Sequence, residues 1–189
     1  FNNNLGYLTQ SPTNLGTGMR ASVMLHLPAL EKSRTIGRIA GNLSKLGLTI
    51  RGAYGEGSEP SGSLYQLSNQ VTLGISEKAA IENLENITKQ LVSQEQQARE
   101  RLAKSIDIQD SVSRSLGLLK SAMVMTHDEA LKLLSNVRFG ILSGQIKDVT
   151  AEVVDSLMEK IEPATLMVNA GKNLSAQERD IERAKILRE

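Results

Sequence analysis

The stretch SPTNLGTGMRASVMLHLP, residues 11–28, decides the fold of the first half of this 189-residue chain. It begins with turn formers and then alternates between apolar and polar side chains. A period of two predicts a β-strand at residues 20–27, with one face on a core and the other free to meet a ligand. Pro28 ends this strand because it lacks the N–H group that a sheet needs. The apolar face consists of Ala21, Val23, Leu25 and Leu27, and the opposite face of Arg20, Ser22, Met24 and His26.

The sequence beyond this strand predicts an alternation of helices and strands. Apolar residues at helical spacing lie between Ile36 and Leu46, and Gly47 stands where a helix C-cap belongs. Strands are expected at residues 48–51 and 64–73, each bounded by glycine.

A long helix is expected to begin after Ser76, with the charged residues 94–101 extending it outward. From about residue 106 onward the pattern is helical only. The sequence therefore predicts an α+β region at residues 1–105, followed by an all-helical module at residues 106–189. The apolar stripe of the long helix comprises Ile81, Leu84, Ile87 and Leu91, and the later helices are expected at residues 111–121, 127–140, 150–161 and 175–188.

Composition narrows the classes of function. The 22 basic and 21 acidic residues give a net charge of +1, which provides no general attraction to nucleic acid or to an anionic membrane. Aromatic residues make up 3%, too few for base-stacking platforms. The lack of cysteine excludes disulfides and thiolate metal sites and is typical of a reducing cytosol. We expect a cytoplasmic protein that binds neither nucleic acid nor membrane.

A second motif, RGAYGEGSE, occupies residues 51–59. Together with PTNLGT and RASV in the opening stretch, it resembles the signature of the phosphagen (guanidino) kinases. This family includes arginine kinase, creatine kinase and the bacterial protein-arginine kinases. The two blocks stand in the family's order and at its spacing. The resemblance implies part of a glutamine-synthetase-like antiparallel sheet domain with flanking helices.

The resemblance also implies an ATP site, with Mg²⁺ neutralising the nucleotide and no metal held by the protein's own side chains. Arg20 and Arg51 suit such a site, because a guanidinium stays protonated and its fork matches phosphate oxygens. Glu56 matches the family's catalytic carboxylate, whose expected role is to orient the acceptor guanidinium. Taken singly, Arg20 and Arg51 would be ordinary surface ion-pair partners, and Glu56 would be a solubilising loop residue. The implied ATP-binding residues are Arg20, Ala21, Ser22, Val23, Met24, Arg51, Gly52, Ala53, Tyr54, Gly55 and Glu56.

Several positions depart from the general family pattern. Ser11 stands where the family usually has cysteine, and a hydroxyl is far less acidic than a thiol. Activity is therefore expected to fall or to shift in its pH dependence, while the phosphate clamp is kept. Met24 replaces the histidine of the metabolite kinases, and Tyr54 and Gly57 also favour the bacterial branch.

A third motif, RDIERA at residues 179–184, resembles the phosphoarginine-binding motif of the bacterial protein-arginine kinases. On a helix, Arg179 and Arg183 share one face, and Asp180 lies beside Arg183 at i, i+3. The arginines can bind a phosphate, the carboxylate can pair with a guanidinium, and small Ala184 admits close approach. The helix itself is expected to rest on its apolar residues Ile181 and Leu187. The structural alternative is a charged helix end.

The resemblance implies a protein-arginine kinase with exposed arginines of proteins as substrates. It also implies a homodimer, and a link to Clp-type proteases and stress-response regulators. Part of the family's active site lies upstream of the first block, so the chain alone is expected to be a fragment without activity. One alternative is a metabolite phosphagen kinase acting on free arginine or a related guanidine. The other is a non-catalytic module for phosphoarginine binding and dimerisation.

Overall fold

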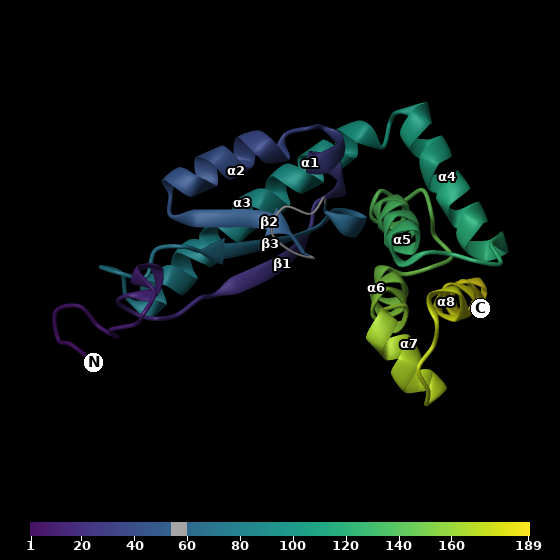
Figure 1. Cartoon of the computed structure of the whole chain (residues 1–189). Helices are drawn as coiled ribbons and strands as arrows, with labels where there is room; N and C mark the ends of the chain where they lie inside the picture. The colour runs from purple at the N-terminus through teal and green to yellow at the C-terminus, as the bar shows by residue number, and fades with distance from the viewer. Residues whose placement is uncertain (54–59) are drawn as a thin grey trace. The chain divides into compact units, whose positions relative to one another are not determined.

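The computed structural model describes residues 1–53 and 60–189 and divides the chain into two compact units, Phe1–Ala98 and Arg99–Glu189 (Figure 1). The first unit combines an antiparallel sheet with helices, and the second is helical. This arrangement confirms the predicted α+β class. The boundary between the two units lies within the helix α3 (Glu77–Leu102). The sequence had placed this boundary after residue 105, which is the position directly before α4 (Ile106–Ser121).

Within the described residues, the sheet has three strands in the order β1-β3-β2. Both strand pairs are antiparallel, and the register places Met24, Gln66 and Arg51 side by side across the sheet. β3 ends at Asn69, four residues earlier than expected, because the segment after it bonds to neighbouring loops instead of a strand. The strands are β1 (Ser22–His26), β2 (Leu48–Gly52) and β3 (Leu64–Asn69).

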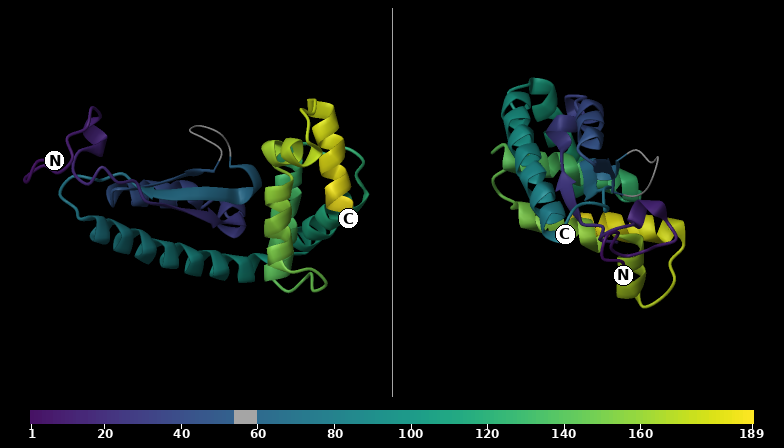
Figure 2. Two further views of the ribbon diagram at one scale, coloured as in Figure 1. Left: turned by 90° about the horizontal axis from the view of Figure 1, so that it is seen from below. Right: turned by 90° about the vertical axis from the view of Figure 1, so that its left-hand side faces the viewer.

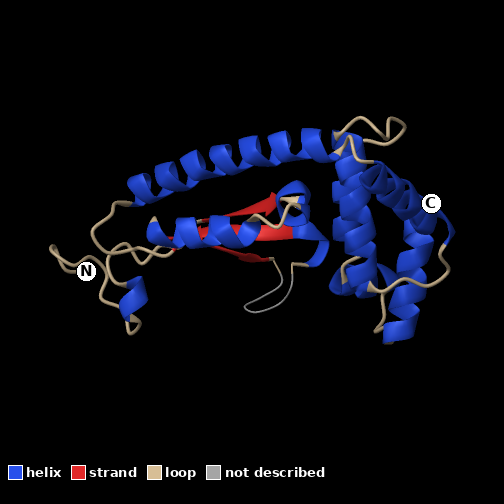
Figure 3. Cartoon of the chain, turned by 90° about the horizontal axis from the view of Figure 1, so that it is seen from above, coloured by secondary structure: helices blue, strands red, loops and turns tan. Residues whose placement is uncertain are grey.

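The strand alternation predicted from the opening stretch is present in β1. Leu25 is buried, while Ser22 and Met24 are exposed. The long helix α3 runs along one face of the sheet, and α2 (Ile36–Lys45) lies beside β2 (Figures 2 and 3). One face of the sheet is thus packed on helices, and the other presents polar side chains.

The helix α3 contributes a buried carboxylate that the sequence did not predict. Its residue Glu95 was expected on an outward charged stretch but is 4% exposed. The carboxylate accepts hydrogen bonds from the backbone N–H groups of Ala29 (2.8 Å) and Leu30 (2.9 Å), at the start of α1 (Pro28–Lys32). The first N–H groups of a helix have no partner within it, and a carboxylate suits them. Ile81, expected in the apolar stripe, is instead 42% exposed.

The second unit contains five helices beyond the end of α3. α4 begins five residues earlier than expected, and α7, which begins at Pro163, was not predicted. Proline is favoured at the first position of a helix, where its missing N–H costs nothing. The helices after α4 (Ile106–Ser121) are α5 (His127–Leu142), α6 (Ala151–Lys160), α7 (Pro163–Ala170) and α8 (Ala176–Arg188).

The helices of the second unit pack around an aliphatic and methionine core. Its members include Met125, Leu131 and Val154, all about fully buried. Gly140 lets α5 approach α4 closely, since an added Cβ would lie 2.4 Å from Val112 Cγ1. Throughout the described part of the chain, the helices are too short or too polar to cross a membrane.

Candidate functional site

A polar hollow of about 410 Å³ lies beside the sheet in the first unit. Its lining residues come from the first loop, from the segment just before β1, from β2, and from the end of β3 and the residues after it. Among its described lining residues there are two arginines and no carboxylate. The lining consists of Thr13, Asn14, Arg20, Thr49, Arg51, Asn69, Gln70 and Thr72.

The two predicted arginines, 31 positions apart in sequence, therefore line one hollow. Arg51 lies in β2, opposite Gln66 of β3. Arg20 lies two residues before the start of β1 at Ser22. The Arg20 Nη2 donates a hydrogen bond to the hydroxyl of Ser68 at 3.1 Å. Two guanidinium groups in a hollow without a carboxylate among its described residues favour a phosphate or polyphosphate.

The turn-rich loop forms the rim of this hollow. Pro12–Asn14 is a short 3-10 helix. The hydroxyl of Thr72 lies 2.8 Å from the carbonyl oxygen of Thr13 and 2.7 Å from that of Leu15. Gly16 has a φ of 105°, and an added Cβ would lie 2.1 Å from the Thr72 carbonyl oxygen. The glycine of the motif is thus required by backbone geometry and close approach.

Ser11, where the family resemblance led us to expect cysteine, lies at the start of this loop. Its hydroxyl is 2.7 Å from the hydroxyl of Thr13, which lines the hollow. The serine therefore joins the rim through a neutral hydrogen bond.

The structure separates the remaining residues of the predicted ATP site. Met24 is exposed on the face that carries Arg51, whereas Val23 is paired with fully buried Leu67 on the helix-covered face. Gly52 ends β2, and Ala53 follows it. The expected catalytic carboxylate Glu56, together with Tyr54, Gly55 and Gly57, lies outside the described residues.

Sequence reasoning missed the residues at the end of β3 and directly after it. Asn69 and Thr72 are each 7% exposed, and both line the hollow. A signal was available, because asparagine followed by glutamine is unfavourable inside a strand and points to a strand end. Thr49 and Gln70 also line the hollow and were not predicted.

The third motif lies on α8 in the second unit, and two of its six residues, Arg183 and Ala184, are buried. Arg183 is 1% exposed. Its Nη1 donates to Asp180 Oδ1 at 2.6 Å and to the Met125 carbonyl at 2.8 Å, while its Nε donates to the Ile161 carbonyl at 3.2 Å. The expected pairing of Asp180 with Arg183 is present, and this pair joins α8 to the residues before α5 and after α6.

The other residues of the motif differ in accessibility. Arg179 is half-buried, and its Nη1 donates to the Leu174 carbonyl at 2.7 Å. Ala184 is fully buried in the core, and the Asp180 side chain keeps 25% exposure. Ile181 was expected to anchor the helix but is 44% exposed, so the anchors are Leu187, Ala184 and the arginine network.

The start of α8 carries a capping box. The Ser175 hydroxyl accepts from the Glu178 N–H at 3.3 Å, and the Glu178 carboxylate accepts from the Ser175 N–H at 2.8 Å. These hydrogen bonds with Ser175, from its backbone first, lower the pKa of Glu178.

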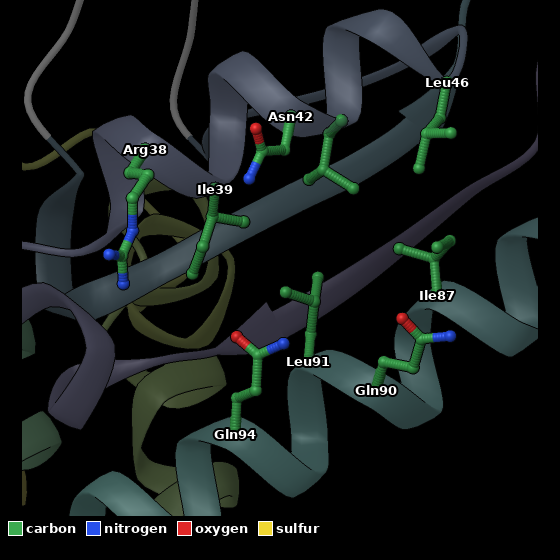
Figure 4. A pocket seen from close by; sticks show the side chains of 9 residues that line it. Arg38, Ile39, Asn42, Leu46, Ile87, Gln90, Leu91 and Gln94 are labelled. Atoms are coloured by element: carbon green, nitrogen blue, oxygen red, sulfur yellow. The ribbon is translucent and has the colours of Figure 1, made fainter.

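A second hollow of about 440 Å³ lies between α2 and α3 (Figure 4). Arg38 is the one cation in its described lining, and Asn42, Gln90 and Gln94 add amides around aliphatic side chains. Across the described part of the chain, histidine, aspartate and glutamate form no group of three that could hold a metal ion. The hollow beside the sheet therefore remains the better candidate for chemistry.

An antiparallel sheet that directs two arginines into one polar hollow suits a protein that handles phosphate. Comparison with known families agrees: residues 1–98 match the family described as ATP:guanido phosphotransferase, C-terminal catalytic domain. The chain belongs to the ATP:guanido phosphotransferase family. Residues 105–189 match a second family, described as the protein-arginine kinase McsB C-terminal domain. The resemblance inferred from the three motifs is thereby confirmed.

Curated relatives are named protein-arginine kinase. The chain is 51% identical to the one from Halothermothrix orenii, 48% to one from a Geobacillus species and 47% to one from Clostridium acetobutylicum. Each alignment covers 100% of this chain but 53–56% of the relative. The chain thus spans about half the length of these relatives.

Proposed function

We propose that the protein containing this chain transfers the γ-phosphoryl group of ATP to arginine side chains of other proteins. The observation that carries the proposal is the hollow lined by both Arg20 and Arg51, in a chain whose relatives are named protein-arginine kinase. The helical second unit supports a protein-arginine kinase over a kinase of free arginine, since it matches a domain described by that activity.

The chemistry asks for positioning and for neutralisation of charge. A guanidinium nitrogen of the acceptor forms a bond to the γ-phosphorus, the bond to the bridging oxygen breaks, and ADP and a proton leave. Arg20 and Arg51 hold the phosphate oxygens and offset their charge in the transition state. Mg²⁺ would reach the site with the nucleotide, because the hollow offers no carboxylate among its described lining.

The proposed ATP contacts fall into three groups. Arg20, Ser22 and Met24 lie on or beside the exposed face of β1, and Arg51 lies beside them on β2. Ala21 and Val23 would contribute through the backbone, as would Gly52 and Ala53. Tyr54, Gly55 and Glu56 complete the set by family resemblance, with Glu56 holding the acceptor guanidinium.

We also propose that the α8 motif binds phosphoarginine. The half-buried Arg179 and the partly exposed Asp180 are the members a ligand can reach, so they would contact its phosphate and guanidinium. Arg183 and Ala184 would support that surface from within the core. If the first unit proved inactive in the intact protein, this motif would still fit a non-catalytic phosphoarginine-binding module.

The biological setting is proposed from the same resemblance. The kinase would act in the cytoplasm as a homodimer and mark proteins for Clp-type proteolysis, including stress-response regulators. Exposed apolar residues of the second unit, among them Ile106 (73%) and Met123 (70%), are available for contacts between copies.

Kinetics of the intact protein test the proposal. Arg20→Ala and Arg51→Ala should each lower kcat/KM for an arginine-rich protein about 10²-fold, the scale for losing one preorganised charge stabiliser. Arg114→Ala is the matched control, since this exposed arginine pairs with Asp110 on its own helix. Equal turnover of the three variants would contradict the assignment. Glu56→Gln should impair transfer while nucleotide affinity is kept.

A further inference from the structure

The side-chain amide of Asn69 forms hydrogen bonds to backbone groups on both sides of Arg20 and to Val71. Asn69 is the last residue of β3 and is 7% exposed. Its Oδ1 accepts from the Ala21 N–H at 2.7 Å, and its Nδ2 donates to the Met19 carbonyl at 3.1 Å and the Val71 carbonyl at 3.2 Å. One amide therefore grips the backbone on both sides of Arg20.

The Asn69 side chain replaces one backbone hydrogen bond between β1 and β3. The pairing of β1 with β3 ends at Ser22 and Ser68, and beyond it the Asn69 N–H still donates to the Ala21 carbonyl at 3.3 Å. The return bond from the Ala21 N–H goes to the Asn69 side chain and not to its carbonyl. The amide thus continues the ladder where the backbone has turned away.

The Asn69 side chain holds the segment that carries Arg20. Gly18, with a φ of 63°, lies just before Met19, so the chain enters this segment through a permissive residue. Arg20 itself is exposed and makes one side-chain hydrogen bond within the described residues, to Ser68. Its direction into the hollow therefore depends on how firmly its backbone is held.

The chemistry of the amide is specific. Asparagine supplies an acceptor and two donors in one plane, which matches the one N–H and two carbonyls around it. Aspartate would place oxygen against both carbonyls, and alanine would leave three partly buried backbone groups without this partner. We propose that Asn69 is a positioning residue, which holds Arg20 in the direction needed to bind a nucleotide phosphate. The inference rests on the proposed ATP-binding role of Arg20.

ATP binding by the intact protein, measured by titration calorimetry, tests this role. Asn69→Ala should weaken ATP binding on the order of tenfold, since small displacements of a binding group carry large costs. The matched control is Asn136→Ala, which removes a partly buried asparagine bonded to Ser115 in the second unit. The control should lose stability and keep its ATP affinity.

A double-mutant cycle separates positioning from general destabilisation. If Asn69 acts through Arg20, Asn69→Ala should change ATP affinity less than about twofold in an Arg20→Ala background. The same cycle followed by thermal melting should show the full stability loss in both backgrounds. Additive losses of affinity would overturn the inference. If Asn69→Ala fails to fold, the smaller change Asn69→Ser takes its place in the same cycle, and additivity there is equally decisive.

The outcomes also distinguish this inference from the proposed function. Unchanged ATP affinity in Arg20→Ala would overturn both the role of Arg20 and the inference built on it. Weakened binding in Arg20→Ala with normal binding in Asn69→Ala would overturn the inference alone.

Discussion

Replacement of Arg183 by alanine should destabilise the second unit strongly, in spite of the position's charged character. The change removes the hydrogen bonds to Asp180, to the Met125 carbonyl and to the Ile161 carbonyl. It also leaves a carboxylate that is only 25% exposed without its cation, and a cavity in place of a fully buried side chain.

Breaking a buried ion pair by removing one partner costs about 3–5 kcal/mol. The residual exposure of Asp180 favours the lower end of this range, because water can solvate part of its charge. For a unit of this size, that loss corresponds to a fall in Tm on the order of 15 °C. Thermal melting followed by circular dichroism measures it.

Arg179→Ala is the matched control on the same helix. Arg179 makes one hydrogen bond to a carbonyl and is half-buried, so its loss should cost roughly 1 kcal/mol. Substituting both Arg183→Met and Asp180→Leu should recover much of the stability, since no uncompensated charge remains. A Tm for Arg183→Ala as high as that of Arg179→Ala would refute the reasoning.

Three further predictions concern other parts of the chain. Arg179→Ala should abolish binding of phosphoarginine without unfolding α8, and calorimetric titration with phosphoserine as the comparison ligand would show whether the motif is selective. Gly140→Ala should cost about 1–3 kcal/mol, because the new Cβ would meet Val112 at 2.4 Å; an unchanged melting temperature would mean that α4 and α5 can separate. The lowered pKa of Glu178 means that its stabilising contribution is present above the unfolded pKa and is lost as pH falls through the folded value. Acid titration of Glu178→Gln should therefore show a weaker loss of stability with falling pH, and an identical profile would exclude this contribution.

Local patterns predicted much of the fold. The alternation in residues 20–27 predicted β1, and the spacing from Ile36 to Gly47 predicted α2 and its end. What failed depended on tertiary contacts. The sequence of α3 by itself predicts a solvent-exposed Glu95. The residue is buried because its carboxylate binds N–H groups of α1, more than 60 residues earlier in the chain.

In the candidate site, too, local patterns predicted some residues, while others depend on tertiary contacts. Motifs identified Arg20 and Arg51, because each lies in a recognisable block. The roles of Asn69 and Thr72 come from hydrogen bonds to residues about 50 to 60 positions away, which no local pattern encodes. The motif on α8 is visible in the sequence, but the burial of Arg183 is not. It depends on the carbonyl groups of Met125, before α5, and of Ile161, at the end of α6.

The most direct test of the account identifies the product of the intact protein. The protein is incubated with ATP, Mg²⁺ and an arginine-rich protein, and the phosphorylated residue is determined by mass spectrometry and by its stability in acid. We predict phosphate on arginine side chains of the protein substrate, lost in acid because the bond joins phosphorus to nitrogen, and strongly reduced by Arg20→Ala and Arg51→Ala. Transfer to free arginine alone, acid-stable phosphate on hydroxyl side chains, or a yield from Arg20→Ala and Arg51→Ala equal to that of the unsubstituted protein would contradict the account.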